Sequence, residues 1–160
     1  MISRTSEYAL RAIVCLGGSH GRPLTTRVIA EQTRVPPDYL SKVLQGLSRA
    51  GMVVSQRGMG GGFTLRRPLD TLTVLDVINA VDPLKRIEQC PLGLEAHRHQ
   101  LCSLHQRLDD GIALVEALYA STTIAELLAM ANPDSQFCEQ GDPVDPRRAS
   151  PDVLVHKSSA

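Results

Sequence analysis

Residues 36–68 have the sequence PPDYLSKVLQGLSRAGMVVSQRGMGGGFTLRRP, in which the apolar pattern changes midway. In the first half, apolar residues recur at spacings of three and four, which predicts a helix that begins at Pro37 and ends at Gly51. In the second half, the short runs MVVSQ and FTLRR flank the glycine-rich segment RGMGGG. Two such runs around a glycine-rich turn predict a β-hairpin.

Two further helices are predicted before this block. The first ends at the pair Gly17-Gly18, and Thr25 or Thr26 can cap the second, TRVIAEQTR. The apolar face of the first helix consists of Ala9, Ala12, Ile13 and Leu16. Three helices followed by a hairpin form a winged helix-turn-helix, which is a DNA-reading architecture. The sequence therefore predicts a mainly α fold with a small β-hairpin wing.

The chain after Pro68 predicts more helices around an irregular segment at 83–102. Thr73 can cap one helix, and a longer helix is expected from about Cys102 to Ala120. Thr123 with Glu126 resembles a capping box for a last short helix. The long helix has apolar residues at a spacing that suits a seam against another helix, namely Leu108, Ile112, Val115 and Tyr119.

The net charge of zero conceals an uneven distribution. Residues 1–69 carry ten Lys/Arg against three Asp/Glu, a net charge of +7, whereas residues 70–160 carry −7. We expect 1–69 to be a DNA-binding domain, because a basic half in a neutral chain indicates a polyanionic partner. We expect 70–132 to contain a sensor loop and dimerisation helices. The proline-rich stretch 133–160 is expected to be a disordered tail.

Targeting signals also limit the class of protein. No apolar run approaches the ~20 residues that a membrane span needs. The N-terminus lacks the basic start and apolar centre of a signal peptide. The sequence therefore predicts a cytoplasmic protein with no membrane partner.

The predicted recognition helix and wing supply the candidate DNA contacts. In a helix-turn-helix the leading residues of the second helix meet base edges, and wing glycines let the backbone approach DNA closely. The candidates are Asp38, Tyr39, Ser41, Lys42 and Gln45 on the helix, with Arg57, Gly58, Gly60 and Gly61 in the wing. The alternatives are a solvated polar face and a tight turn without DNA contact. A phosphate-binding nucleotide loop is disfavoured, because a strand rather than a helix follows the glycines.

The segment CPLGLEAHRHQLCSLH, residues 90–105, contains two of the four cysteines and three of the five histidines. Cys102 and His105 are three residues apart at a helix start and so share a face. Thiolate and imidazole ligands suit iron–sulfur clusters or zinc. The alternative is free thiols packed beside solvent-facing histidines. A cysteine nucleophile with His105 as base would lack an orienting acid and an oxyanion site, so we do not expect an enzyme.

Three blocks of the sequence resemble the IscR/NsrR-type transcriptional regulators of the Rrf family, which are bacterial winged-helix proteins. They are EYALRAI at 7–13, the block 36–68, and LTVLDVINAVD at 72–82. The resemblance implies a homodimer joined along the helix near 103–120. It also implies binding to a palindromic operator in double-stranded DNA.

Cluster-binding members of that family carry three cysteines with five residues between neighbours, and a histidine three beyond the last. On this chain those positions fall on Cys90, Ala96, Cys102 and His105, so the middle cysteine is missing. The resemblance makes His97 a candidate substitute beside the gap. It also makes Glu7 of the partner subunit a candidate ligand, and an iron–sulfur cluster the candidate cofactor.

The sequence as a whole predicts a dimeric DNA-binding transcriptional regulator that acts as a repressor. Its segment 83–105 is expected to respond to a redox, nitric-oxide or metal signal. One alternative is a cofactor-free regulator of the same fold that senses through thiols or a partner protein. Another is a winged-helix protein–protein adaptor that does not bind DNA.

Overall fold

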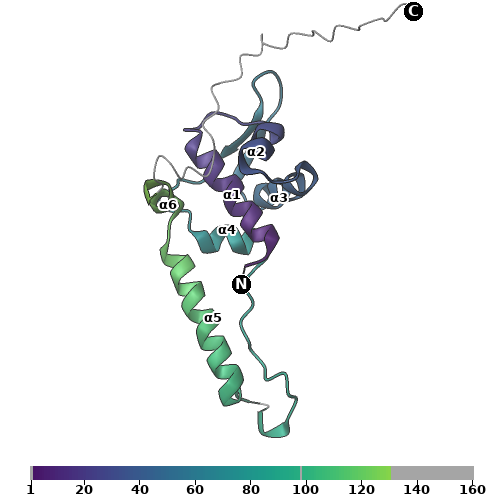
Figure 1. The fold of residues 1–160 in the computed structure, drawn as a ribbon, viewed down its shortest axis with the longest axis vertical. Helices are drawn as coiled ribbons and strands as arrows, with labels where there is room; N and C mark the ends of the chain where they lie inside the picture. Colours follow the sequence, from purple (N-terminus) through teal and green to yellow (C-terminus); the bar gives the residue numbers. More distant parts are fainter. Residues whose placement is uncertain (1, 98, 131–160) are drawn as a thin grey trace, which may run out of the picture.

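The computed structural model describes residues 2–97 and 99–130, which form α-helices, a two-stranded hairpin and one short 3-10 helix. In chain order these are α1 (Arg4–Gly18), α2 (Thr26–Thr33), α3 (Pro37–Arg49), β1 (Val53–Gln56), β2 (Gly62–Leu65), α4 (Val74–Val81), the 3-10 helix (Glu95–His97), α5 (Ser103–Ser121) and α6 (Ile124–Met130). Figure 1 shows α5 extending away from a body formed by the other helices, with the hairpin at the opposite end of the molecule. In the part that the structure describes, no helix is long and apolar enough to cross a membrane.

Capping side chains set the helix starts that the sequence predicted. The Thr25 hydroxyl accepts the Val28 N–H at the start of α2, at 3.3 Å. At the start of α4, Thr73 and Asp76 cap each other's backbone N–H in a capping box. Each such cap stabilises a helix by about 1 kcal/mol, so these positions define where the helices begin.

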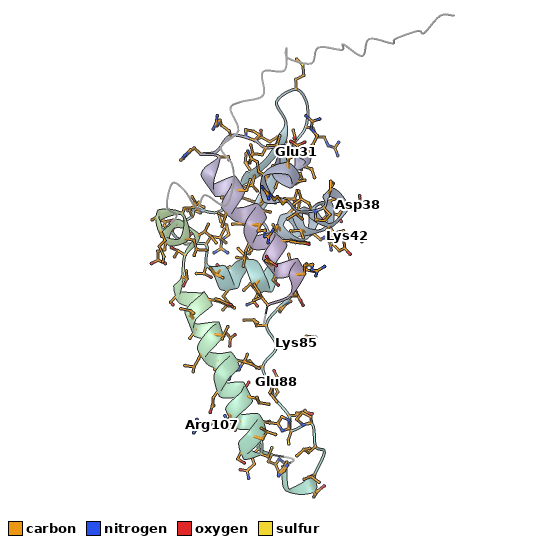
Figure 2. The ribbon with its side chains drawn as sticks, viewed as in Figure 1. Glu31, Asp38, Lys42, Lys85, Glu88 and Arg107 are labelled. Carbon is orange, nitrogen blue, oxygen red and sulfur yellow. The ribbon has the colours of Figure 1, made fainter. Side chains whose placement is uncertain are left out.

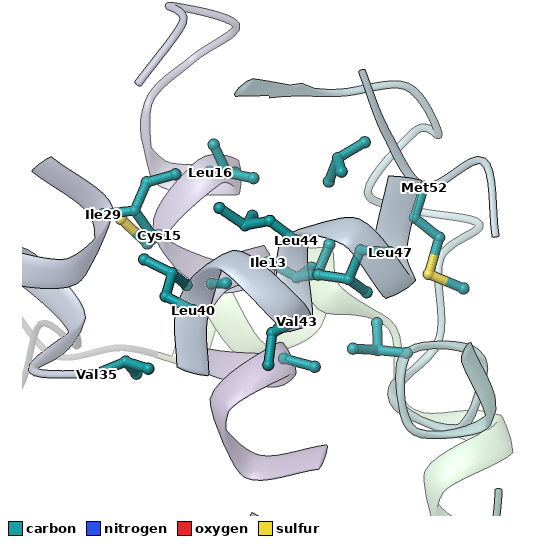
Figure 3. Packing of buried hydrophobic residues seen from close by; sticks show 14 of the residues in the cluster. Ile13, Cys15, Leu16, Ile29, Val35, Leu40, Val43, Leu44, Leu47 and Met52 are labelled. Atoms are coloured by element: carbon teal, nitrogen blue, oxygen red, sulfur yellow. The ribbon is translucent and has the colours of Figure 1, made fainter. Parts of the chain in front are cut away.

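The core lies between α1, α2 and α3, as the close view in Figure 3 shows. Ile13 and Leu16 of α1 meet Leu40, Leu44 and Leu47 of α3, and all five side chains are buried. Burying side chains of this size contributes about 1.5–3 kcal/mol each. Because the apolar face of α3 is turned inward, its polar face is held toward solvent.

The core continues past residue 69. Leu72, Ile78 and Ile124 are fully buried in the same cluster as the first three helices. The Ile124 N–H donates to the Leu72 carbonyl at 2.9 Å, which attaches α6 to the body. A division of the chain into independent units at this point stays a prediction, and the expected tail at 133–160 lies outside the described residues.

The long helix α5 leaves most of its apolar residues exposed. Only Asp109 is buried among its described side chains. A row at heptad spacing faces solvent and consists of Leu104, Leu108, Gly111, Val115 and Leu118. Two residues that the sequence placed on the seam differ. Ile112 is half-buried beside the exposed Gly111, and Tyr119 packs against the core, while Leu118 is 61% exposed. The expected seam therefore ends on Leu118, because the last turn of α5 returns to the body.

Candidate functional site

The five predicted residues of the recognition helix are all exposed on α3. Figure 2 shows Asp38 and Lys42 at the outer edge of the body. The Ser41 hydroxyl donates to the Pro37 carbonyl at 3.0 Å, so its oxygen still has a lone pair for a base donor. Tyr39 leans toward α1, where its ring meets Tyr8 edge to face at a centroid distance of 6.2 Å. The solvent side of α3 thus presents a cation and hydrogen-bonding groups, which suits a major groove.

The wing turn joins β1 to β2 at residues 57–61, and three of its glycines are required by the backbone. Gly58 and Gly60 have φ of +101° and +80°, which disfavours residues with a Cβ. A Cβ on Gly61 would lie 2.4 Å from the Gln56 carbonyl oxygen, where there is no room for it. The Gly61 N–H also donates to the Gly58 carbonyl at 2.9 Å. The turn therefore exposes backbone and leaves the Arg57 side chain in solvent.

Arg34, which the sequence analysis did not single out, lies in the turn between α2 and α3. Its φ of +54° and ψ of +34° place it in the left-handed region. Glycine or asparagine is the usual residue there, so an arginine gives no sequence signal for this conformation. Arg34 is exposed, and it precedes Pro37, the first residue of the recognition helix, by three positions.

Cys102 and His105 meet because they are the N-cap and third residue of α5. Side chains at these two positions lie side by side, as in a capping box. The Cys102 Sγ lies 3.1 Å from the His105 Nδ1, and the thiol does not cap the helix backbone. The start of α5 therefore holds one sulfur and one imidazole in contact.

Cys90 reaches the same place from the segment between α4 and α5. Its Sγ lies 3.4 Å from the His97 Nδ1 and 3.6 Å from the His105 Nδ1. Burial raises the pKa of the Cys90 thiol, but hydrogen bonds from the Leu92 and Cys102 backbone and from the Cys102 side chain outweigh it. The pKa of Cys90 consequently lies below its ordinary value, which favours the thiolate that binds metals.

The donor atoms of Cys90, Cys102 and His105 all lie within 4.8 Å of one another. With Zn–S near 2.3 Å and Zn–N near 2.0 Å, neighbouring sulfur and nitrogen ligands of a tetrahedral ion are about 3.5 Å apart. The sulfur–nitrogen separations of 3.1, 3.4 and 3.6 Å are close to that value. Two thiols and one imidazole, those of Cys90, Cys102 and His105, therefore fit zinc or iron in both chemistry and spacing. His97 contacts Cys90 but is not in this group of three.

Glu7, the candidate ligand from a second subunit, has a partner within its own chain. Its carboxylate pairs with the Arg11 guanidinium, which also donates to the Thr33 carbonyl at 3.3 Å. Glu7 is not among the donors that the structure groups around Cys90. Only the Oε1 atom of Glu7 takes part in this ion pair, so Oε2 is the atom that another subunit would use.

An ion pair fixes the segment that carries Cys90 against α5. Two nitrogens of the Arg86 guanidinium donate to the two Asp109 carboxylate oxygens at 2.8 and 2.6 Å. The Ile87 N–H donates to the same carboxylate at 2.9 Å, and Arg86 also binds Glu116 at 3.2 Å. Hydrogen bonds from Arg86 and Ile87 lower the pKa of Asp109 to about 2, and those from Asp109 and Glu116 raise the pKa of Arg86. We call this group the Arg86–Asp109 clasp.

The clasp was not predicted from the sequence. Asp109 is buried on a helix whose other described side chains are not, but Arg86 is 23 residues away. Figure 2 shows Lys85 and Glu88, which flank the clasp residues, on the segment that runs alongside α5. The only local signal for the clasp was Asp109, an acidic residue on the face of α5 that turns inward.

An exposed recognition helix, a glycine wing and a separate Cys/His group define a class of protein, the winged-helix transcriptional regulators. A family model agrees with this class. The Rrf2 model, described as "Iron-dependent Transcriptional regulator", matches residues 2–130. This chain belongs to the Rrf2 family, and it is a transcriptional regulator rather than an enzyme.

Relatives and solved structures agree with the family. HTH-type transcriptional regulators from Aquifex aeolicus and Mycobacterium tuberculosis are 28% and 29% identical over 131 and 135 residues. These alignments cover 80% and 83% of this chain, and 91% and 84% of the relatives. The predicted winged-helix family and fold are thereby confirmed.

Two solved structures have the same fold. CymR of B. subtilis, described as its global cysteine regulator, has a TM-score of 0.67 at 28% identity and covers 82% of this chain and 98% of its own. IscR of T. potens has a TM-score of 0.66 at 23% identity and covers 81% and 86%.

Proposed function

We propose that this protein is a homodimeric, DNA-binding repressor whose Cys/His group binds iron and controls operator binding. The observation that carries the proposal is the meeting of Cys90, Cys102 and His105, with His97 in contact with Cys90. The family description as iron-dependent supports iron as the metal. An iron–sulfur cluster and a single iron ion are the two forms to be distinguished.

Binding to DNA is assigned to α3 and the wing. Ser41, Lys42 and Gln45 would reach base edges in the major groove, and Arg57 would reach the minor groove or phosphate. Asp38 and Tyr39 lie at the start of α3, where recognition helices enter the groove. Exposure of all these side chains supports the assignment.

Dimerisation is assigned to the exposed seam of α5, with a second copy of this chain as the occupant. The seam follows a heptad repeat over the 19 residues of the helix, and Gly111 leaves open space in which another helix can approach. A two-fold axis through this seam would place two α3 helices on one DNA duplex, which explains the expected palindromic operator.

Control of DNA binding is assigned to the path from the Cys/His group to α5. Bound iron would supply a centre that reacts with oxidants or nitric oxide. Cys102 is the N-cap of α5, and Cys90 belongs to the segment that the Arg86–Asp109 clasp holds against α5. A change in how these residues are held would shift α5, and with it the separation of the two reading helices.

The metal proposal is tested by purifying the protein without oxygen and measuring its visible spectrum, iron and sulfide. Wild type should be coloured and contain iron, and Cys102→Ser should lose it. Cys138→Ser, which lies outside the described residues, serves as the matched control and should keep its iron. Iron with sulfide indicates a cluster, iron without sulfide a single ion. Wild type without iron would contradict the proposal.

A thiol pair is the second candidate, favoured by the Cys90 and Cys102 sulfurs lying within 4.8 Å. Oxidation by a peroxide would remove one hydrogen from each thiol and form one S–S bond, while the peroxide is reduced to water. Peptide mapping after peroxide treatment of metal-free protein should then find Cys90 linked to Cys102. Their recovery as separate thiols would exclude this candidate.

An adaptor that does not bind DNA is distinguished by a binding assay with duplex DNA. A regulator that contacts several phosphates binds at low salt and weakens steeply as salt is added. Failure of wild type to bind any duplex at low salt would favour the adaptor.

A further inference from the structure

A pocket of about 360 Å³ lies where the start of α1, one side of α3 and the end of α4 meet. Arg4 and Tyr8 line it from α1, Lys42 and Arg49 from α3, and Val81 from α4. Only Lys42 of these residues was a candidate DNA contact from the sequence.

The charge of this pocket is positive. Arg4, Lys42 and Arg49 are exposed, and none forms an ion pair with a carboxylate of the described residues 2–97 and 99–130. Glu7, one turn along α1 from Arg4, is paired with Arg11 instead. The N-terminus of α1 adds its positive dipole on the same side. These groups together attract an anion.

The walls of the pocket are formed by close packing. A Cβ on Gly46 would lie 3.2 Å from the Val81 Cγ1, so α3 and α4 approach closely at this point. The edge-to-face contact between Tyr8 and Tyr39 joins α1 to α3. A preformed site of this kind binds without the cost of ordering its walls.

The pocket lies on the side of α3 that would face a DNA strand. An α-helix with its side chains is about 10–12 Å across, and the major groove is about 12 Å wide, so each side of a bound helix faces one phosphate backbone. Tyr39, Lys42, Gly46 and Arg49 follow one another at spacings of three and four and share that side. Lys42 therefore stands between the groove-facing surface and the pocket.

We propose that this pocket, which we call the α1–α3 pocket, binds a backbone phosphate of the strand beside α3. Arg4 and Arg49 neutralise the phosphate, and Lys42 lies at the mouth. The inference rests on the proposed DNA binding and adds two cation–phosphate interactions outside the reading face and the wing. Because phosphates carry no sequence information, these interactions set affinity and register without selecting bases.

The test is the salt dependence of binding to a random-sequence duplex, in wild type and in Arg4→Gln/Arg49→Gln. The slope of log K against log salt falls by about 0.9 for each phosphate that is no longer neutralised, so the double variant, which loses this one phosphate, should have a slope smaller by about 0.9. For Arg49→Gln alone the decrease should be about half as large. Arg4→Lys/Arg49→Lys should keep the wild-type slope.

Arg107→Gln is the matched control, because it also removes one cation but from an 86% exposed side chain on α5. Its slope should equal that of wild type. Steep wild-type binding with an unchanged slope in the double variant would overturn the α1–α3 pocket alone. Absence of duplex binding by wild type would instead overturn the proposed function.

A free anion is distinguished by NMR with ring-labelled tyrosine. Two of the three tyrosines, Tyr8 and Tyr39, line the pocket, and Tyr119 lies on α5. Duplex should shift the signals of the first two and leave Tyr119 unchanged. If millimolar inorganic phosphate reproduces these shifts while the salt slopes of all variants are equal, the site belongs to a small anion and the proposal is wrong.

Discussion

Arg34 combines an unfavourable backbone conformation with an exposed cation at the start of the recognition helix. A non-glycine residue in the left-handed region costs about 1–2 kcal/mol, and glycine largely avoids this cost. Arg34 makes its turn at φ +54° with no glycine present. Contact between the Arg34 guanidinium and DNA would offset this cost in the complex. Backbone strain of this kind is concentrated at functional sites.

Replacing Arg34 with glycine should therefore stabilise the fold. We expect Arg34→Gly to raise the free energy of unfolding by about 1 kcal/mol, because the left-handed conformation loses its steric penalty. Urea denaturation measures this value. Arg27→Gly, the same replacement inside α2, should instead lower it by about 1 kcal/mol. Equal destabilisation by both variants would contradict the role of the backbone at Arg34.

The Asp109 carboxylate should remain ionised to unusually low pH. Its pKa of about 2 lies below the unfolded value of about 3.9, so its stabilising effect is complete above pH 4 and is lost as the pH falls toward 2. The Ile87 amide, which donates to this carboxylate, should keep a constant NMR shift from pH 7 to 4 and change only below that. A titration of that amide centred near pH 4 would refute the clasp, and Asp109→Asn should show no such change.

Part of the Cys/His group could be predicted from local signals in the sequence. Cys102 and His105 were predicted together because an N-cap and the third helical residue always lie close. Cys90 and His97 come from an irregular segment, where spacing alone does not set distance. The Arg86–Asp109 clasp that positions this segment joins residues with no local pattern, so only the tertiary structure reveals it.

At the scale of the elements, helix caps and apolar periodicity were sufficient to predict the helices and the hairpin. Thr25, Thr73 and Thr123 each begin a helix as expected. The periodicity of apolar residues does not show which element an apolar face packs against. For α5 the predicted seam was therefore wrong in part. Tyr119 contacts the body because α6 folds back onto Leu72, which leaves Leu118 on the exposed seam.

The exposed seam of α5 should be required for the dimer. Leu108→Glu places a charge in the middle of the proposed interface and should weaken dimerisation at least 100-fold, because a buried unpaired charge costs several kcal/mol. Sedimentation should then show monomers with unchanged helix content. Ala117→Glu, which adds the same charge to another side of α5, should remain dimeric. Dimers in both variants would place the interface elsewhere.

At the scale of the whole molecule, α5 separates the predicted DNA-binding surface from the predicted sensor. The sequence analysis assigned the first to the basic half of the chain and the second to the acidic half. The reading helix and wing belong to the body, whereas the Cys/His group lies at the far end of α5 (Figure 1). The Arg86–Asp109 clasp and the segment from α4 connect these ends. Within one chain, a ligand change at one end therefore acts through α5 or this segment to reach the reading helix.

Coupling between iron and DNA is the central claim, and one binding measurement addresses it directly. A duplex is first selected from a randomised pool by iron-loaded wild-type protein, and its affinity is then compared before and after iron is removed. We predict a change of at least fivefold, the lower end of allosteric coupling energies, and no change on the same treatment of Cys102→Ser. Equal affinity of the iron-loaded and iron-free wild-type protein would contradict the account.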